Sequence, residues 1–205
     1  GSAALGRDIH GNDAKAGGWG YIFGDEGSAY WIAVEALRAI GYSLDGSIPE
    51  TTLLPAFLNH FSVESFGDIH RLVYSGELAR VDIADLAKLV HQNALQEDMI
   101  AQNILQRAGM ALARLPLAIL PKLDFGDMPV LIGIVGGVWK SDGFVRNTFE
   151  HCIREQYPQV NIVVPTIPAA AASAILAMKF GGIEITAEIL GNVVSSVSRY
   201  PQLKR

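Results

Sequence analysis

Cysteine is nearly absent from this chain of 205 residues, since Cys152 is the only one. A single cysteine excludes an intrachain disulfide and a metal site built from several thiolates, and it favours the reducing cytoplasm as the compartment. A basic excess is lacking as well, because the formal net charge is −5, which argues against a nucleic-acid partner. Uncharged apolar runs are too short to cross a bilayer core of roughly 30 Å, so no membrane partner is expected.

What is present is the composition of a globular domain, with half of the residues hydrophobic and 18% charged. Glycine is concentrated at the start, where eight of the 21 fall within the first 28 residues. That density favours β-hairpins and tight loops, because glycine alone adopts positive φ without steric cost. We expect a turn at residues 8–12 and a short strand at residues 21–23.

The middle of the chain has the three- and four-residue spacing of apolar side chains that is typical of helices. It predicts helices over residues 28–40, 51–60, 65–74, 83–94 and 97–115. Pro116 is expected to end or kink the last of them, because proline cannot donate the next helical hydrogen bond.

The second half has a different pattern. Two apolar runs, residues 129–135 and 160–164, predict strands buried on both faces. Helices are expected after each strand, over residues 142–157 and 169–178, and an amphipathic helix over residues 186–198 follows. Strand, helix, strand and helix in this order predict an α/β fold with parallel strands.

The first string that could carry chemistry is GGWGYIFGDEGS, at residues 17–28. Gly18, Trp19 and Gly20 expose backbone amides, and Asp25 precedes the predicted helix. A carboxylate there can accept hydrogen bonds from sugar hydroxyls while free N–H groups bind further oxygens. The alternative is a purely structural helix cap, in which the acidic residues only favour the helix dipole.

The second string is IVGGVWKS, in which a predicted strand ends at Gly136 and Gly137. Two glycines let a flat ring approach the backbone, and the following helix start can bind phosphate or ribose oxygens. A plain glycine-containing turn is the alternative. The string is not a P-loop. That motif requires glycine directly before its lysine, but in this sequence the residue before Lys140 is Trp139.

Taken whole, GGWGYIFGDEGSAYWIAVEAL closely resembles the sugar-side loop of the N-acetylglucosamine kinase branch of the BadF/BadG/BcrA/BcrD-type ATPases. The resemblance implies that Gly18, Trp19, Gly20 and Asp25 contact an amino sugar, N-acetylglucosamine or glucosamine. It also implies an α/β fold, the C-terminal lobe of an actin-like (sugar kinase/Hsp70) ATPase, with a mixed sheet, flanking helices and a helical insertion.

The second string is similar to the adenosine motif of the actin-like ATPases. By that resemblance Gly136, Gly137 and Ser141 lie at the nucleotide, ATP, which acts with Mg²⁺. A helix carrying Ala84 would approach the adenine, where a small residue leaves space. Helix packing explains that alanine equally well.

The first two residues resemble the end of a Gly-Thr-Gly-Ser phosphate loop that precedes the Gly-Trp-Gly segment in such kinases. Gly1 would then lie at the nucleotide and Ser2 at the sugar, although a cloning remnant also reads Gly-Ser. Ala3 replaces a polar residue that often follows this serine in relatives, which leaves one sugar contact in doubt.

The resemblance assigns residues 1–182 to the C-terminal lobe. Residues 183–205 would form a terminal helix that belongs to the same domain or returns toward a first lobe. That first lobe carries an Asp-Gly-Gly-Thr phosphate loop and the aspartate that deprotonates the sugar, and neither occurs in this sequence. The general base is therefore unknown, no metal ligand is assigned, and we expect this chain alone to lack kinase activity.

Several functions stay open. The leading one is phosphoryl transfer from ATP to the C6 hydroxyl of N-acetylglucosamine, with the N-terminal lobe of the same protein as partner and with a homodimer also allowed. A glucosamine kinase would use similar loops. A BadF-type activator holds an iron–sulfur cluster through cysteines, which a single cysteine disfavours. A non-catalytic sugar- or nucleotide-binding module is the remaining alternative.

Overall fold

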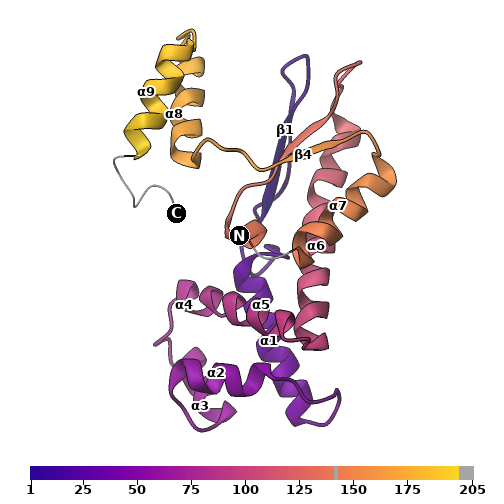
Figure 1. Cartoon of the computed structure of the whole chain (residues 1–205), viewed down its shortest axis with the longest axis vertical. Helices are drawn as coiled ribbons and strands as arrows, with labels where there is room; N and C mark the ends of the chain where they lie inside the picture. The colour runs from indigo at the N-terminus through magenta and orange to yellow at the C-terminus, as the bar shows by residue number, and fades with distance from the viewer. Residues whose placement is uncertain (141–142, 199–205) are drawn as a thin grey trace. The chain divides into compact units, whose positions relative to one another are not determined.

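The computed structural model of the protein describes residues 1–140 and 143–198 (Figure 1). The chain forms two compact units. The first comprises residues 1–132 and 136–161, and the second comprises residues 133–135 and the chain from residue 162 onward. The predicted division at residue 182 stays a prediction.

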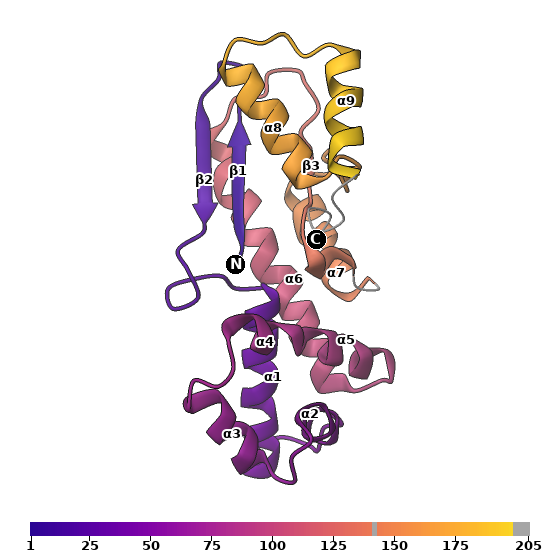
Figure 2. The ribbon, with the colours of Figure 1, turned by 90° about the vertical axis from the view of Figure 1, so that its left-hand side faces the viewer.

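A β-hairpin opens the first unit. β1 (Ala3–Arg7) pairs antiparallel with β2 (Asp13–Gly17), and Arg7 lies opposite Asp13. Their side chains form a two-point ion pair, with both N–O distances at 2.7 Å. The hairpin expected from the glycine-rich start is confirmed, and Figure 2 shows it lying along helix α6 (Met99–Ile119).

The prediction of a strand at residues 21–23 is wrong. These residues form turns, and the Phe23 side chain is 83% exposed. The reason lies just before them, where Gly17, Gly18 and Gly20 all have positive φ and bend the chain away from the hairpin. The segment therefore has no strand beside it to supply hydrogen bonds.

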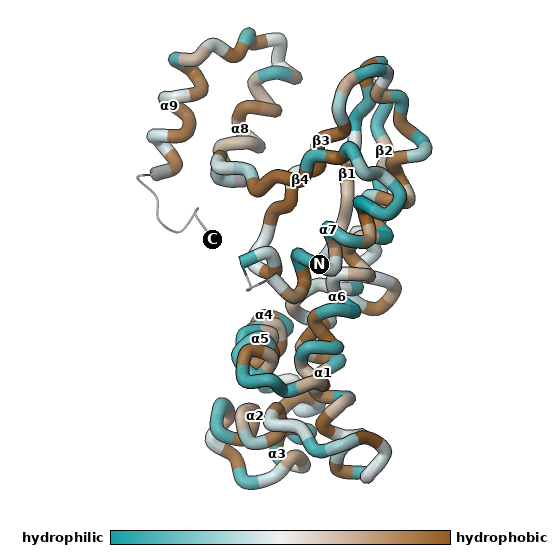
Figure 3. The backbone as a smooth tube through the Cα atoms, turned by 45° about the vertical axis from the view of Figure 1, so that its right-hand side comes forward, coloured by the Kyte–Doolittle hydropathy of each residue, from teal (hydrophilic) through white to brown (hydrophobic). Residues whose placement is uncertain are grey.

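Helices α1 and α6 carry the main core of the first unit. α1 (Ala29–Leu44) begins at Ser28, whose hydroxyl accepts the Trp31 N–H at 3.3 Å, as predicted for a helix start here. α1 buries one face against its neighbours, through Ile32, Ala33, Ala36, Ala39 and Ile40. Figure 3 shows hydrophobic and hydrophilic residues alternating along both helices, as one buried face requires.

α6 does not end at Pro116, so the first of the two outcomes expected there is wrong, and a kink stays a prediction. The helix continues to Ile119 and passes into the 3₁₀ turn η1 (Leu120–Lys122). A proline inside a helix removes one N–H donor and its ring crowds the preceding turn, but Pro116 is buried in the core, so packing holds the last turn in place. Its first turn is capped by the buried Asp98, whose carboxylate accepts the N–H groups of Ile100 and Ala101.

Four shorter helices lie between α1 and α6: α2 (Leu53–Phe61), α3 (Phe66–Tyr74), α4 (Arg80–Asp85) and α5 (Ala87–Leu95). The single helix predicted at residues 83–94 is thus two helices. The two helices meet at Leu86, where the hydrogen bonds span three residues instead of four. The Leu86 N–H donates to the Ile83 carbonyl, and the Leu89 N–H donates to the Leu86 carbonyl. α4 and α5 both pack against α1.

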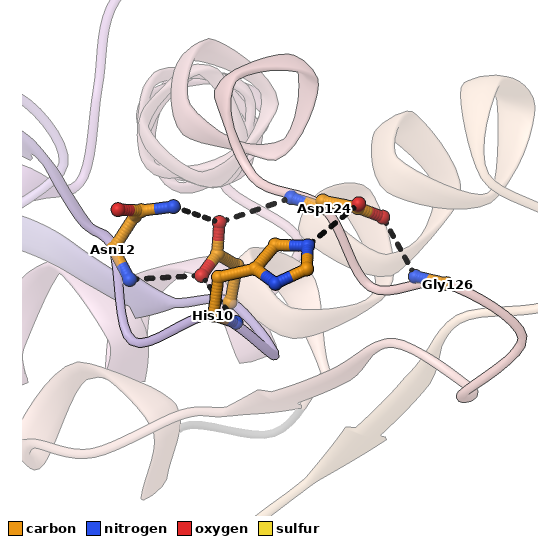
Figure 4. A network of polar contacts seen from close by, with 5 residues as sticks. His10, Asn12, Asp124 and Gly126 are labelled. Atoms are coloured by element: carbon orange, nitrogen blue, oxygen red, sulfur yellow. Dashed lines mark hydrogen bonds and ion pairs between the residues drawn. The ribbon is translucent and has the colours of Figure 1, made fainter.

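Hydrogen bonds join the tip of the hairpin to the turn after η1, and Figure 4 shows these contacts. The Asp8 carboxylate accepts the backbone N–H groups of His10 and Asn12 at 2.9 and 2.8 Å. His10 Nε2 lies 3.1 Å from Asp124 Oδ2, and Asp124 Oδ1 accepts the Gly126 N–H at 2.9 Å. The turn predicted at this tip is confirmed. The Asn12 side-chain hydrogen bond lowers the pKa of Asp8, and the bonds from Gly126 and His10 lower the pKa of Asp124.

α7 (Phe144–Gln156) packs closely on α6 because Gly109 has no side chain. A Cβ on Gly109 would lie 2.5 Å from the Val145 carbonyl oxygen. α7 buries three side chains, Val145, Phe149 and Ile153. The helix predicted at residues 142–157 is confirmed over these bounds.

β3 (Leu131–Gly133) and β4 (Asn161–Val163) form a second two-stranded sheet. Asn161 donates to the Val130 carbonyl and Ile134 donates to the Val163 carbonyl, each at 2.9 Å. The two hydrogen bonds advance in the same direction along both strands, so the strands are parallel, as predicted.

Two expectations for these strands are wrong. They are not buried on both faces, since the Leu131 side chain is 65% exposed and Ile134 alone is buried among residues 130–135. Among the described residues there is also no single mixed sheet, but one antiparallel and one parallel pair. Neighbouring strands cover only the edges of a strand, so its faces stay exposed wherever no other layer packs on them.

In the second unit α8 (Ala169–Phe180) packs against α9 (Ala187–Ser198), close to the predicted bounds. The fold is α/β and mostly helical, with small sheets. Within the described part of the chain, no helix has the length and apolar character needed to span a membrane.

Candidate functional site

Residues 17–28 connect the hairpin to α1, and we term them the Gly-Trp-Gly loop. Asp25 lies in the second half of this loop. Its side chain is only 6% exposed, and its backbone has φ of 64°. Its Oδ1 accepts the Ser2 N–H at 3.1 Å, and its carbonyl accepts the Ser28 N–H at 3.1 Å. Left-handed conformations of residues other than glycine concentrate at ligand sites, so Asp25 has the geometry of a functional residue.

The first two residues are joined to this aspartate. The Ser2 hydroxyl donates to the Glu26 carbonyl at 2.9 Å, and the Ser2 carbonyl accepts the Gly18 N–H at 2.8 Å. A Cβ on Gly1 would lie 2.8 Å from Asp25 Oδ1, so a side chain at this position would displace the carboxylate. The structure therefore brings together four of the predicted site residues: Gly1, Ser2, Gly18 and Asp25.

Trp19 and Gly20 belong to the same loop. The Trp19 side chain is 76% exposed, although a large indole is usually largely buried. A Cβ on Gly20 would meet no atom within 4 Å, so the backbone there borders open space. An exposed indole beside accessible backbone forms a surface on which a flat apolar ring face can rest.

The position of the loop against α6 depends on a residue that sequence reasoning did not single out. Gly27 has φ of 77°, and a Cβ there would lie 2.5 Å from Leu112 Cγ and 2.6 Å from the Ala108 carbonyl oxygen. The loop can approach α6 this closely only with glycine at this position. The repeated glycines of the string were the available signal.

Two cations near the loop were also missed. The Arg80 guanidinium carbon lies 4.3 Å from the centroid of the Tyr21 ring, and Tyr21 meets Tyr30 edge to face at 5.4 Å. Lys15 Nζ lies 3.3 Å from the position of a Cβ on Gly18. Only the hairpin register could have suggested Lys15, and no sequence pattern joins Arg80 to Tyr21.

Apart from Gly1, the described residues that were predicted to bind the nucleotide lie elsewhere in the first unit. Gly136 has φ of 126°, and Gly137 begins the 3₁₀ turn η2 (Gly137–Lys140). A Cβ on Gly137 would meet nothing within 4 Å, so the backbone there is accessible. Trp139 packs edge to face on Phe149 at 4.9 Å, which holds η2 against α7. Ser141 lies outside the described residues.

Ala84 is half-buried in α4. Within residues 1–140 and 143–198, no hydrogen bond or ring contact links Ala84, Gly136 or Gly137 to Asp25. The same ranges contain no group of three or more His, Cys, Asp or Glu side chains placed to hold a metal ion. Contacts within the chain thus connect Ser2, Gly18 and Asp25, with Gly1 beside the carboxylate, and leave Ala84, Gly136 and Gly137 separate from them.

Comparison with known proteins shows to which family the chain belongs. The model of the BadF/BadG/BcrA/BcrD ATPase family matches residues 1–176. The chain belongs to this family. Membership agrees with the resemblance found in the Gly-Trp-Gly loop, and the BadF/BadG/BcrA/BcrD family implies an actin-like ATPase fold.

Individual relatives are similar over most of the chain. An N-acetylmuramic acid/N-acetylglucosamine kinase from Clostridium acetobutylicum is 29% identical over 177 residues, which are 86% of this chain and 58% of that protein. An N-acetyl-D-glucosamine kinase from Dictyostelium discoideum is 27% identical over 180 residues, which are 87% of this chain and 56% of that protein. The chain therefore spans little more than half the length of these relatives.

A solved structure is also similar. It is the crystal structure of a protein from Chromobacterium violaceum that is provisionally named an N-acetylglucosamine kinase. The TM-score is 0.57 at 25% identity, over 75% of this chain and 49% of the other. The likeness supports the actin-like fold and again covers about half of the larger protein.

Proposed function

We propose that this chain is the sugar- and nucleotide-binding lobe of an amino-sugar kinase. The complete enzyme would transfer the γ-phosphoryl group of ATP to the C6 hydroxyl of N-acetylglucosamine or a close relative of it. The observation that carries the proposal is Asp25, a buried carboxylate in a left-handed conformation beside the exposed backbone of the Gly-Trp-Gly loop. Family membership and the kinase names of the relatives support it.

Each loop residue has a binding role in this proposal. Asp25 Oδ2 accepts hydrogen bonds from sugar hydroxyls, while Oδ1 keeps its bond from Ser2. The accessible backbone at Gly20 binds further sugar oxygens, Gly18 shapes the loop through its N–H bond to the Ser2 carbonyl, and the Trp19 indole covers an apolar face of the ring. Asp25 is assigned to binding and not to proton transfer.

The nucleotide is assigned to Gly1, Ala84, Gly136, Gly137 and Ser141. Accessible backbone at the two adjacent glycines admits a flat ring, and the start of the following helix favours anionic oxygens. Mg²⁺ would be bound mainly through the phosphates of ATP, where it would neutralise charge during transfer.

The general base and the remaining phosphate contacts are assigned to a first lobe outside this chain. Phosphoryl transfer requires ATP and acceptor to be held in line, and one lobe provides only one side of that arrangement. We therefore propose the N-terminal lobe of the same protein as the obligatory partner, the cytoplasm as the compartment, and no turnover by residues 1–205 alone.

The test is a turnover assay with the complete polypeptide that carries this chain. Incubation with ATP, Mg²⁺ and N-acetylglucosamine is expected to yield the 6-phosphate, identified by the phosphorus–proton coupling in its NMR spectrum. Residues 1–205 alone, assayed in parallel, should give none. Sugar binding without any phosphorylated product from the complete polypeptide would instead favour a non-catalytic binding module.

A further inference from the structure

Two cationic side chains border the Gly-Trp-Gly loop. Arg80, the first residue of α4, holds its guanidinium over the Tyr21 ring at 4.3 Å, and Tyr21 directly follows Gly20. Lys15, exposed on β2, reaches the start of the loop beside Gly18. Across residues 1–140 and 143–198, neither cation has an ion pair or a hydrogen bond to an acidic side chain.

Other cations of the chain are used differently. Arg7 pairs with Asp13, Arg71 with Asp68 and Lys88 with Asp85, at 2.7 to 3.0 Å. The charges of these three arginine and lysine residues are compensated within the fold. The charges of Lys15 and Arg80 are not, so they raise the electrostatic potential at the loop.

The loop itself contributes two carboxylates, Asp25 and Glu26. An anionic ligand would be repelled by them unless nearby cations offset their charge. A guanidinium held over an aromatic ring keeps its N–H donors directed outward in a fork that matches a carboxylate. Among the described residues, the Arg80 fork therefore has no acidic partner, and it lies over a ring that directly follows Gly20 in the chain.

We propose that Arg80, assisted by Lys15, forms an anion subsite beside the amino sugar, and that the preferred substrate carries a carboxylate on an arm of its ring. This inference rests on the proposed function and specifies its substrate class. N-acetylmuramic acid is an amino sugar of this class, because a lactyl ether adds a carboxylate to N-acetylglucosamine. The Clostridium relative is named for both sugars.

Calorimetric titration of the complete polypeptide with N-acetylmuramic acid and with N-acetylglucosamine measures the preference as a ratio of dissociation constants. The wild type is expected to bind N-acetylmuramic acid more tightly, and less so as salt is added. Arg80→Gln should weaken that sugar about tenfold and leave N-acetylglucosamine within about twofold, as expected for one charge-assisted bond. Lys15→Gln should lower the preference by about threefold, as a more distant charge would.

Two variants separate recognition from structure. Arg80→Lys keeps the charge without the fork, so its preference should lie between those of the wild type and Arg80→Gln. Arg71→Gln removes an exposed, paired arginine of α3 and should change neither sugar. An equal loss of both sugars in Arg80→Gln would show a merely structural role and overturn the inference.

An ATP analogue, titrated in the same variants, separates the sugar carboxylate from the nucleotide phosphates. It should bind unchanged. Weaker analogue binding with an unchanged sugar preference would assign the cations to phosphate and overturn the inference. Binding of N-acetylglucosamine with no preference for N-acetylmuramic acid would overturn this inference alone, whereas no response to either sugar would overturn the proposed function as well.

Discussion

The backbone N–H of Ser2 donates to Asp25 Oδ1 at 3.1 Å, which joins the start of the β-hairpin to the loop that precedes α1. The bond uses one carboxylate oxygen and orients the other. The backbone of Asp25 is left-handed, at φ of 64°. The predicted sugar contacts therefore depend on the correct placement of the first residues of the hairpin.

The first prediction concerns this bond. Asp25→Ala removes the acceptor of the Ser2 N–H and places alanine at positive φ, so the free energy of unfolding should fall by about 2 kcal/mol. Asp25→Asn keeps an acceptor oxygen and tolerates the left-handed region, so its loss should stay below about 1 kcal/mol. Urea unfolding followed by circular dichroism measures both. Equal stability of the two variants would contradict the role of the Ser2 bond.

Gly27 provides a test of how the loop contacts α6. Gly27→Ala combines positive φ with a Cβ 2.5 Å from Leu112 Cγ, so it should cost about 3 kcal/mol of unfolding free energy. Gly46→Ala is the matched control, since Gly46 has φ of 73° and nothing within 4 Å of its Cβ. Conformational strain alone should cost about 1 kcal/mol there. The close contact is refuted if the two losses are equal.

Trp19 should report ligand binding through its fluorescence. Its indole is exposed to water in the free protein, so a sugar that covers it should shift the emission to shorter wavelength. Trp19→Phe should abolish the shift, and Trp31→Phe, which removes a half-buried indole on α1, should preserve it. A shift that persists without Trp19 would place the sugar elsewhere.

The hairpin tip should respond to acid. The pKa of Asp124 is lowered from 3.8, chiefly by the Gly126 N–H and then by His10. A lowered folded-state pKa means that the carboxylate stabilises the folded state above the ordinary pKa and that this contribution is lost as pH falls through the folded-state value. The tip contacts should therefore persist at neutral pH and weaken below about pH 3.8.

NMR of the Gly126 amide measures this change, because its proton shift reports the bond to Asp124 Oδ1. In Asp124→Asn the same shift should be independent of pH in this range. A Gly126 amide whose shift stays constant in the wild type down to strongly acidic pH would contradict the assignment.

Local patterns were sufficient to predict most of the fold. Ser28 and the apolar spacing behind it placed α1, and glycines marked the hairpin and the turns. Properties that depend on tertiary contacts were not predictable. Pro116 lies inside α6, where it is buried by packing, and Leu131 is exposed although it belongs to an apolar run.

The candidate site divides in the same way. Gly18, Trp19, Gly20 and Asp25 could be chosen from a continuous string. The left-handed backbone of Asp25 was not predictable, because aspartate adopts that conformation only where surrounding contacts hold it. Nor was the position of Arg80 over Tyr21, since helices α1 to α3 separate the two in sequence.

The central claim is that the Gly-Trp-Gly loop binds an amino sugar through Asp25. Calorimetric titration of N-acetylglucosamine into the complete polypeptide, its Asp25→Asn variant and the exposed control Asp45→Asn tests it most directly. The account predicts saturable binding to the wild type and to Asp45→Asn, and affinity lower by about tenfold or more in Asp25→Asn, whose fold is retained. Undiminished binding by a folded Asp25→Asn protein would contradict it.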